Sequence, residues 1–463
     1  MACATLFLIA PLHAQGPPSR PQESQAASAS PAEARAQPEA SEGWPQWRGP
    51  AGTGVSAERA LPLHWSEKEG VAWRSPLGGT GVSTPIVWGD RIFVTSQSGA
   101  GNRREGNHPT LVQGGGAKEA GERALSKPVD SDRVRFLIEA FDRGDGRRLW
   151  SFELPAEGTL PAVHEKHNLA SASPVTDGER VYAVFGTGQV VAVDTAGKRV
   201  WHRNLAAEHG PFEVNWGHGS SAIVYRDSVI LPCYHEPQSY LLAMDAKTGV
   251  TRWKVDRGAK VVSYSTPIIV TAAGGDELVL NTSAAIEAYR PATGEALWRV
   301  DEESRFAIPM PVHEGGVVYA SRGYRSGPYL AIRTGGRGDV SASHVRWKAP
   351  TGAPYISSLV YAEGLLFMAG DVGVVTGVDA KTGERVWQER IDGIFTASPI
   401  VAGGRLYLIS ETGETIVMRA ARTPEVLACN RIDARLLASP ALSGGRLFLR
   451  TDDQLIAISG RSS

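Results

Sequence analysis

The sequence predicts an all-β protein: an eight-bladed β-propeller of four-stranded antiparallel blades, closed into a ring by an N-terminal strand. Three observations predict this fold class. The 463 residues include 52 Gly and 12 Trp, which favours tight turns and short strands anchored by aromatic side chains. A tryptophan-containing motif recurs along the chain at the spacing of propeller blades. Short apolar strand starts also recur eight times.

The repeated motif is Asp-x-x-Thr-Gly followed by a strand that carries a tryptophan. Its clearest copies run from Met244 to Trp253 and from Val378 to Trp387. The Gly supplies the positive φ that a tight hairpin needs, and the Trp strand should be the outermost strand of its blade. We expect these tryptophans to be structural residues that pack between blades. They are spaced 51, 52, 45, 49 and 40 residues apart, in the order Trp150, Trp201, Trp253, Trp298, Trp347 and Trp387.

One unit shows how the strands divide. Residues 397–401 are predicted to form a short apolar first strand, which a Gly-Gly turn connects to a second strand over residues 405–410. The third strand is expected over residues 415–419. The fourth strand of this unit has Leu427-Ala-Cys429 where the other units have Trp.

The units share Ser, Thr or Pro residues at the predicted start of the first strand, where the missing N–H of proline costs little. These starts lie at residues 83–85, 173–174, 220–221, 265–267, 309–311, 357–358, 398–399 and 439–440. The eighth unit ends at Ile458 without a fourth strand, whereas a spare Trp73 strand precedes the first unit. We therefore predict that residues 71–75 complete the last blade, which removes both sheet edges and makes residues 44–460 one domain.

Two segments precede the predicted propeller. Residues 3–12 are apolar and lead into Leu12-His-Ala14, which resembles a small-residue cleavage site, so residues 1–14 are predicted to be a signal peptide. Residues 15–43 contain no Val, Ile, Leu, Met or aromatic residue and are predicted to be a disordered tether. These features predict a bacterial protein that is exported to the periplasm or associated with the cell envelope.

The Asp-x-x-Thr-Gly-x-x-x-Trp signature resembles the pyrroloquinoline-quinone-like (PQQ-like) repeat family of eight-bladed propellers. This family includes quinoprotein alcohol dehydrogenases and the outer-membrane assembly lipoprotein BamB, so the resemblance implies the fold more strongly than the function. The enzymes of the family typically carry adjacent cysteines near the quinone, whereas Cys3, Cys233 and Cys429 are far apart in this sequence. The resemblance therefore implies a BamB-like exported propeller and leaves PQQ open as a cofactor.

Strand counting places the long insertions on one face of the disk. In a four-stranded blade, the turns after the second and fourth strands lie on the face opposite to the turns after the first and third. The insertions that follow a second or fourth strand are residues 97–133, 151–170, 202–218, 233–239 and 322–328. We call this side the long-loop face, and it is the predicted site because long loops on a rigid scaffold usually carry binding residues.

Histidine and aromatic residues gather in these loops, and six of the 11 histidines lie between residues 164 and 235. Three interpretations stay open: hydrogen-bonded or solvated loop residues, a face that binds a small ligand or a partner, and a transition-metal site. The metal site would use His164, His167, His218 or His235, for which His-x-x-His is a weak signal. The candidate residues of the face are His164, His167, Asn168, Glu213, Trp216, His218, Tyr234, His235, Glu236, Tyr264, Arg305, Arg322, Tyr324, Arg325 and Tyr355.

Composition and motifs exclude several function classes. The 48 Lys and Arg balance 49 Asp and Glu, which argues against a nucleic-acid binder held by bulk charge. The sequence has no run of 18 apolar residues and no nucleotide-binding or hydrolase motif in a suitable context. The prediction is a non-catalytic, monomeric propeller that needs no cofactor and binds a protein partner or a small ligand. The alternatives are a PQQ-using oxidoreductase and a small-ligand-binding or metal-binding propeller.

Overall fold

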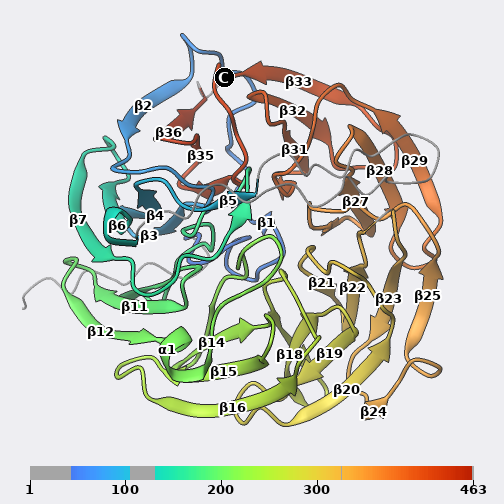
Figure 1. Ribbon diagram of the computed structural model, residues 1–463. Helices are drawn as coiled ribbons and strands as arrows, with labels where there is room; N and C mark the ends of the chain where they lie inside the picture. Colours follow the sequence, from blue (N-terminus) through green and yellow to red (C-terminus); the bar gives the residue numbers. More distant parts are fainter. Residues whose placement is uncertain (1–42, 105–130, 325, 461–463) are drawn as a thin grey trace, which may run out of the picture. The chain divides into compact units, whose positions relative to one another are not determined.

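The computed structural model describes residues 43–104, 131–324 and 326–460. The described chain forms eight four-stranded antiparallel blades in a propeller ring (Figure 1), so the predicted fold class is confirmed. The predicted signal peptide, almost all of the predicted tether and most of the first long loop (residues 105–130) lie outside the described residues.

Seven blades follow the chain order from the innermost to the outermost strand, and an N-terminal strand completes the eighth. Blades 1 to 4 contain β3 (Ile86–Trp88), β4 (Arg91–Ser98), β6 (Arg135–Asp142) and β7 (Arg148–Pro155); β9 (Val175–Thr176), β10 (Arg180–Val184), β11 (Gln189–Asp194) and β12 (Arg199–Asn204); β13 (Ile223–Tyr225), β14 (Ser228–Cys233), β15 (Ser239–Asp245) and β16 (Thr251–Gly258); β17 (Ile268–Ala272), β18 (Gly275–Asn281), β19 (Ala285–Tyr289) and β20 (Ala296–Asp301). Blades 5 to 8 contain β21 (Val312–Glu314), β22 (Val317–Ser321), β23 (Tyr329–Arg333) and β25 (Val345–Ala349); β26 (Val360–Ala362), β27 (Leu365–Ala369), β28 (Val374–Asp379) and β29 (Arg385–Arg390); β30 (Ile400–Ala402), β31 (Arg405–Ile409), β32 (Glu414–Arg419) and β33 (Val426–Arg431); β34 (Ala441–Ser443), β35 (Arg446–Arg450), β36 (Gln454–Ser459) and β2 (Val71–Pro76).

The hydrophobic core lies between the blades. The middle strands are buried on both faces, and β14 is buried at every position, because each middle strand lies between two sheet neighbours and two adjacent blades. The outer strands alternate in exposure, as in β33. Each core cluster therefore draws residues from neighbouring blades, as in the cluster that combines Phe93 and Phe136 of blade 1 with Val181 of blade 2.

The predicted closure of the ring is confirmed. Strand β2 pairs antiparallel with β36, and Trp73 lies opposite Ala457 in the register. The Trp73 ring also packs against Phe448, with 6.0 Å between the ring centroids. The N-terminal strand thus covers the edge that blade 8 would otherwise expose.

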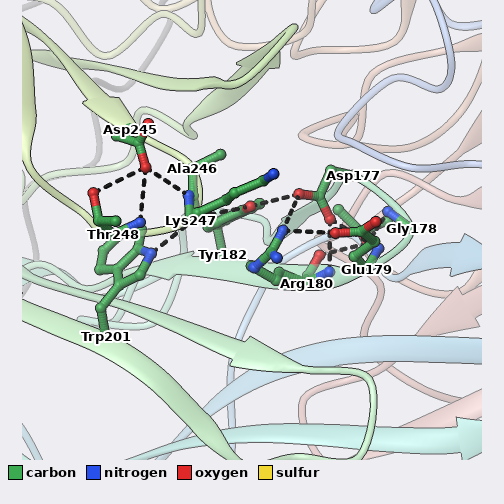
Figure 2. A network of polar contacts seen from close by, with 11 residues as sticks. Asp177, Gly178, Glu179, Arg180, Tyr182, Trp201, Asp245, Ala246, Lys247 and Thr248 are labelled. Atoms are coloured by element: carbon green, nitrogen blue, oxygen red, sulfur yellow. Dashed lines mark hydrogen bonds and ion pairs between the residues drawn. The ribbon is translucent and has the colours of Figure 1, made fainter.

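The outer-strand tryptophans dock each blade on the next one, as Figure 2 shows for blades 2 and 3. The indole Nε1–H of Trp201 donates a hydrogen bond to the carbonyl of Ala246, at 3.0 Å. The hydroxyl of Tyr182 donates to the same carbonyl at 3.1 Å. One oxygen of Asp245 holds this turn by accepting hydrogen bonds from the backbone N–H groups of the two residues after Ala246.

The glycine of the repeated motif leaves room for the tryptophan of the preceding blade. Gly249 has a φ of 73°, and a Cβ at this position would lie 2.8 Å from the Trp201 ring. Similar docking bonds to the next blade are made by Trp73, Trp150, Trp253, Trp347 and Trp387. Trp298 instead donates to Glu277 in its own blade, since a longer connection in blade 5 adds β24 (Gly338–Asp339) beside β20.

The Ser, Thr and Pro residues predicted to begin the first strands lie just before those strands, which corrects the predicted boundaries. The physical reason is that these residues bond across blades instead of within a sheet. The N–H of Thr84 donates to the hydroxyl of Ser173, whose own N–H donates to the hydroxyl of Ser221, both at 2.9 Å. We call this series the hydroxyl ring. In its other hydrogen bonds, a backbone N–H again donates to a hydroxyl: Ser221 to Thr266, Met310 to Ser358, Ser358 to Ser398 and Ser398 to Ser439.

A segment over residues 43–56, which we call the N-terminal plug, lies within the central channel. Trp44 pairs with Val87 of the innermost strand of blade 1. At the other end, β1 (Val55–Ser56) runs parallel to β30, the innermost strand of blade 7, and is visible near the middle of the ring in Figure 1. Between them, the buried Arg48 donates to the carbonyls of Thr53 and of Leu359 in blade 6.

Helices contribute little to the described chain. The α-helix α1 (Leu205–His209) is capped by Asn204, whose side chain accepts a hydrogen bond from Ala207, and η2 (Ser131–Arg133) is a single 3-10 turn. Over the residues that the structure describes, no helix has the length and apolar character needed to cross a membrane.

Candidate functional site

A pocket of about 590 Å³ lies at the mouth of the channel. This volume falls within the range of about 300–1,000 Å³ that is typical of small-molecule sites. Members of the hydroxyl ring line its inner part, together with Trp47 of the N-terminal plug. Because the plug lies in the channel, a ligand would enter this pocket from the long-loop face.

Several of the long loops contact one another. Strand β5 (Arg103–Arg104) of the first insertion pairs with β8 (Val163–His164) of the connector between blades 1 and 2. The N–H of His164 donates to the carbonyl of Trp216, in the next connector. A bridge between Glu213 and Glu236 joins that connector to a loop of blade 3.

Six aromatic rings form a continuous series that contributes to the pocket wall. Neighbouring ring centroids lie 5.0 to 6.3 Å apart, a spacing typical of edge-to-face packing. Four of the rings line the pocket, and the other two pack against these four. We call this series the aromatic belt: His164, Trp216, Tyr264, Phe306, Tyr324 and Tyr355.

Charged groups also lie in the pocket wall. Lys166 Nζ lies 2.8 Å from Glu411 Oε1, and the hydroxyl of Thr396 donates to the same oxygen. The carboxylate of Asp371 accepts hydrogen bonds from the backbone N–H groups of Tyr355 and Ile356, at 3.2 and 3.1 Å. Burial raises the pKa of Asp371 to about 6, against the opposing effect of these two donors.

Asp371 and Glu411 hold equivalent positions in adjacent blades. Each is the second residue of the turn between the second and third strands of its blade. Asp452 holds the same position in blade 8, but it is bound by Arg435 at 2.8 Å and does not line the pocket. Glu411 is ion-paired with Lys166, whereas Asp371 accepts hydrogen bonds from neutral backbone N–H groups.

The structure brings some of the candidate residues together and separates others. The candidates that line the pocket are His164, His167, Trp216, Tyr264 and Tyr355. Arg305 lies over the rings of Phe306 and Tyr324, at 5.3 and 6.0 Å from their centroids. Glu213 and Glu236 are exposed, and Arg325 lies outside the described residues.

Five other candidates are buried within the scaffold, although the sequence placed them on the binding face: Asn168, His218, Tyr234, His235 and Arg322. Arg322 is only 1% exposed because its guanidinium donates to Thr282 and Glu302 carbonyls in blade 4 and the connector that follows. The side chain of Asn168 donates to the carbonyl of Thr80, at 2.8 Å. These bonds give both side chains a structural role.

The two buried histidines, His218 and His235, both pack against the ring of Phe212. The ring centroids of His218 and His235 lie 5.3 and 4.2 Å from that of Phe212. Burial lowers the pKa of His218 to about 4 and that of His235 to about 3. Among the residues that the structure describes, no three His, Cys, Asp or Glu side chains are grouped so that they could hold a metal ion.

We expect the two buried histidines to make the fold sensitive to acid. The unfolded chain binds protons on them near pH 6.5, whereas the folded chain binds them only near pH 4 and pH 3. The free energy of unfolding should therefore be fully retained above pH 6.5 and should fall as the pH drops from 6.5 towards 4. Urea unfolding between pH 4.5 and 7.5 measures this slope.

A substitution separates the histidine effect from general acid sensitivity. His235→Phe removes one titrating group in a site lined by Phe212 and Tyr240, so the slope should fall by about 1.4 kcal/mol per pH unit. The control His64→Phe changes an exposed histidine and should leave the slope unchanged. An unchanged slope in His235→Phe would contradict the assignment of a neutral, buried histidine.

Sequence reasoning missed several residues of the pocket, namely Trp47, Lys166, Asp371 and Glu411. Lys166 lies between the candidates His164 and His167 in the sequence. Its ion-pair partner, Glu411, belongs to blade 7, which the ring brings close although it is far away along the chain. The two acids could have been found by aligning the turns between second and third strands, since both occupy the same turn position. Trp47 lies outside the repeated units, so no repeat pattern indicated its place.

The comparisons identify the family to which this fold and pocket belong. The family model described as "Outer membrane protein assembly factor BamB" matches residues 50–221, 135–337, 283–423 and 373–463. These overlapping matches span the propeller, and the chain belongs to this family of PQQ-like repeat propellers. The predicted family resemblance is therefore confirmed.

Two relatives have names that describe different roles. A tetrathionate hydrolase of Acidithiobacillus ferrooxidans is 25% identical over 360 residues, which cover 73% of this chain and 64% of that protein. The outer membrane protein assembly factor BamB of Moranella endobia is 23% identical over 264 residues, which cover 55% of this chain and 62% of that protein. The matches thus span less than two thirds of either relative.

Among solved structures, a quinohemoprotein alcohol dehydrogenase from Comamonas testosteroni superimposes with a TM-score of 0.63 and 14% identity. The match covers 91% of this chain and 81% of that one. At this identity the likeness shows the propeller fold and says nothing of the reaction, because one fold carries many functions.

Proposed function

We propose that the protein is a non-catalytic binding propeller of the bacterial cell envelope, and that it holds a small ligand in the pocket at its channel mouth. The observation that carries this proposal is the pocket itself, which combines four belt rings, a hydroxyl-lined inner part and a few charged groups. Small-ligand sites are typically mostly apolar with a few placed polar groups. The apolar segment at residues 3–12 supports export.

A quinone cofactor of the family does not fit these residues. Pyrroloquinoline quinone carries three carboxylates, but the lysine that lines the pocket, Lys166, is already paired with Glu411, and Asp371 adds a further acid. The described residues include no group of three His, Cys, Asp or Glu side chains placed to hold a metal ion. Cys233 is buried in blade 3 and Cys429 is exposed in blade 7, so they do not form an adjacent pair. This charge distribution supports a ligand of another kind.

A protein partner on the long-loop face is the second candidate. It is favoured by two apolar side chains at the pocket rim, Val372 and Ile394, which are 38% and 51% exposed. It also agrees with the assembly role named for the BamB relative. In this alternative, the rim would bind the partner and the pocket would take one of its side chains.

Native mass spectrometry of the purified protein tests the proposal with a blocking variant. Ile394→Trp should cover the pocket mouth, so a small molecule retained by the wild-type protein should be lost. Val426→Trp is the matched control, because Val426 is equally exposed, at 53%, but lies on the outer strand β33. Retention of the same molecule by Ile394→Trp would contradict the pocket as the site.

A further inference from the structure

We propose that the pocket binds an organic cation of the ammonium class, with Asp371 as its counter-ion and the aromatic belt as its wall. This inference rests on the proposed function of the same pocket. It names the class of ligand, which neither the fold nor the family determines.

The acids of the pocket wall differ in how their charges are balanced. Lys166 Nζ forms an ion pair with Glu411 at 2.8 Å, whereas Asp371 accepts hydrogen bonds from two backbone N–H groups. The equivalent acid of blade 8, Asp452, is satisfied by the two nitrogens of Arg435. Asp371 differs from both, because its hydrogen bonds come from backbone N–H groups and Lys166 affects its charge less than burial and those bonds do.

The aromatic rings of the belt favour a positively charged ligand. The faces of Trp and Tyr rings attract cations, and quaternary ammonium groups are bound by cages of such rings. Trp216, Tyr264 and Tyr355 line the pocket, and Trp47 adds a fourth ring from the N-terminal plug. Tyr355 also connects the two features, because its backbone N–H donates to Asp371 while its ring belongs to the belt.

Two rings of the aromatic belt already bind a cation of the protein, the Arg305 side chain. The guanidinium of Arg305 lies over the rings of Phe306 and Tyr324. These two rings pack directly against the rings that line the pocket. These ring faces therefore accept a cation, and the faces of Trp216, Tyr264 and Tyr355 in the pocket are of the same chemical kind.

The neutral histidine beside the pocket is consistent with a cation. Burial and the nearby His164 and His218 lower the pKa of His167 to about 3, so His167 adds no positive charge at neutral pH. The hydroxyl ring supplies neutral oxygens for the polar parts of the ligand. An anionic ligand would instead meet Asp371 and Glu411 with one lysine that is already engaged.

Isothermal titration calorimetry at pH 8 tests this class with choline as the probe. The uncharged isostere 3,3-dimethylbutan-1-ol has the same shape, so it isolates the charge. We expect choline to bind at least about tenfold more tightly than the isostere. Asp371→Asn should weaken choline binding by about tenfold, and Trp216→Leu should also weaken it.

The matched control is Asp452→Asn, which removes the equivalent acid of blade 8 outside the pocket and should leave choline binding unchanged. Thermal melting of each variant checks that it folds. Equal binding of choline and the isostere, or equal loss in both Asp variants, would overturn the cation proposal. If the ligand displaced by Ile394→Trp is neutral, the cation proposal is wrong but the proposed small-ligand function stands. If the pocket holds no small ligand, both proposals are wrong.

Discussion

A chain shortened to begin at Leu77 is expected to lose at least about 5 kcal/mol of unfolding free energy, which is comparable to the whole stability of a typical domain. The shortening removes β2, the outermost strand of blade 8, and so exposes the edge of β36. It also removes Trp44 and Trp65, which are 1% and 5% exposed in the folded chain. Deleting buried tryptophans costs about 3–5 kcal/mol each.

The N-terminal plug adds to this loss. Arg48 is buried and donates to the carbonyl of Leu359 in blade 6, so its removal leaves this acceptor without its donor. Circular dichroism during thermal and urea unfolding measures the effect. A chain that begins at Gly43 keeps every described residue and should unfold like the full-length protein. Equal melting temperatures for the Leu77 and Gly43 chains would refute closure by β2.

Substitution of Trp201 by Ala is expected to cost about 3–5 kcal/mol. Trp201 is 8% exposed and packs on Tyr182, with 5.9 Å between the ring centroids. Its ring also covers Gly249 of blade 3, and its indole N–H binds the carbonyl of Ala246. Removing it leaves a cavity between two blades that the rigid strands cannot fill.

The variant Trp201→Phe separates packing from hydrogen bonding. Phenylalanine keeps a ring over Gly249 but lacks the Nε1–H group, so the carbonyl of Ala246 keeps only the hydrogen bond from Tyr182. We expect a cost of about 1 kcal/mol for Trp201→Phe in urea unfolding. If Trp201→Phe were as damaging as Trp201→Ala, the ring would not be the main source of the docking energy.

The fold could be predicted from the sequence because its signal repeats. The Asp-x-x-Thr-Gly turn and the following tryptophan are physically coupled across blades, as Trp201 and Gly249 show, so both recur together. The hydroxyl ring recurs as well, but its Ser and Thr residues were read as strand starts. Their bonds run between blades, from Thr84 to Ser173 for example, and a pattern within one unit cannot show a partner in the next.

The candidate site was predicted less completely. Strand counting predicts a face, because the loops that follow second and fourth strands must lie on one side of the ring. It could not distinguish Tyr355, which lines the pocket, from Arg322, which turns inward to backbone carbonyls, because loop side chains have no periodic orientation. The N-terminal plug was missed because residues 43–56 have no counterpart in the repeat.

The central claim is that the pocket at the channel mouth is the ligand site. An experimental structure of the protein purified from its native host, solved without added ligand, tests this claim most directly. We expect ordered density of a small molecule between Asp371 and the rings of Trp216 and Tyr355. A pocket filled by water alone, together with a ligand or partner bound on another surface, would contradict it.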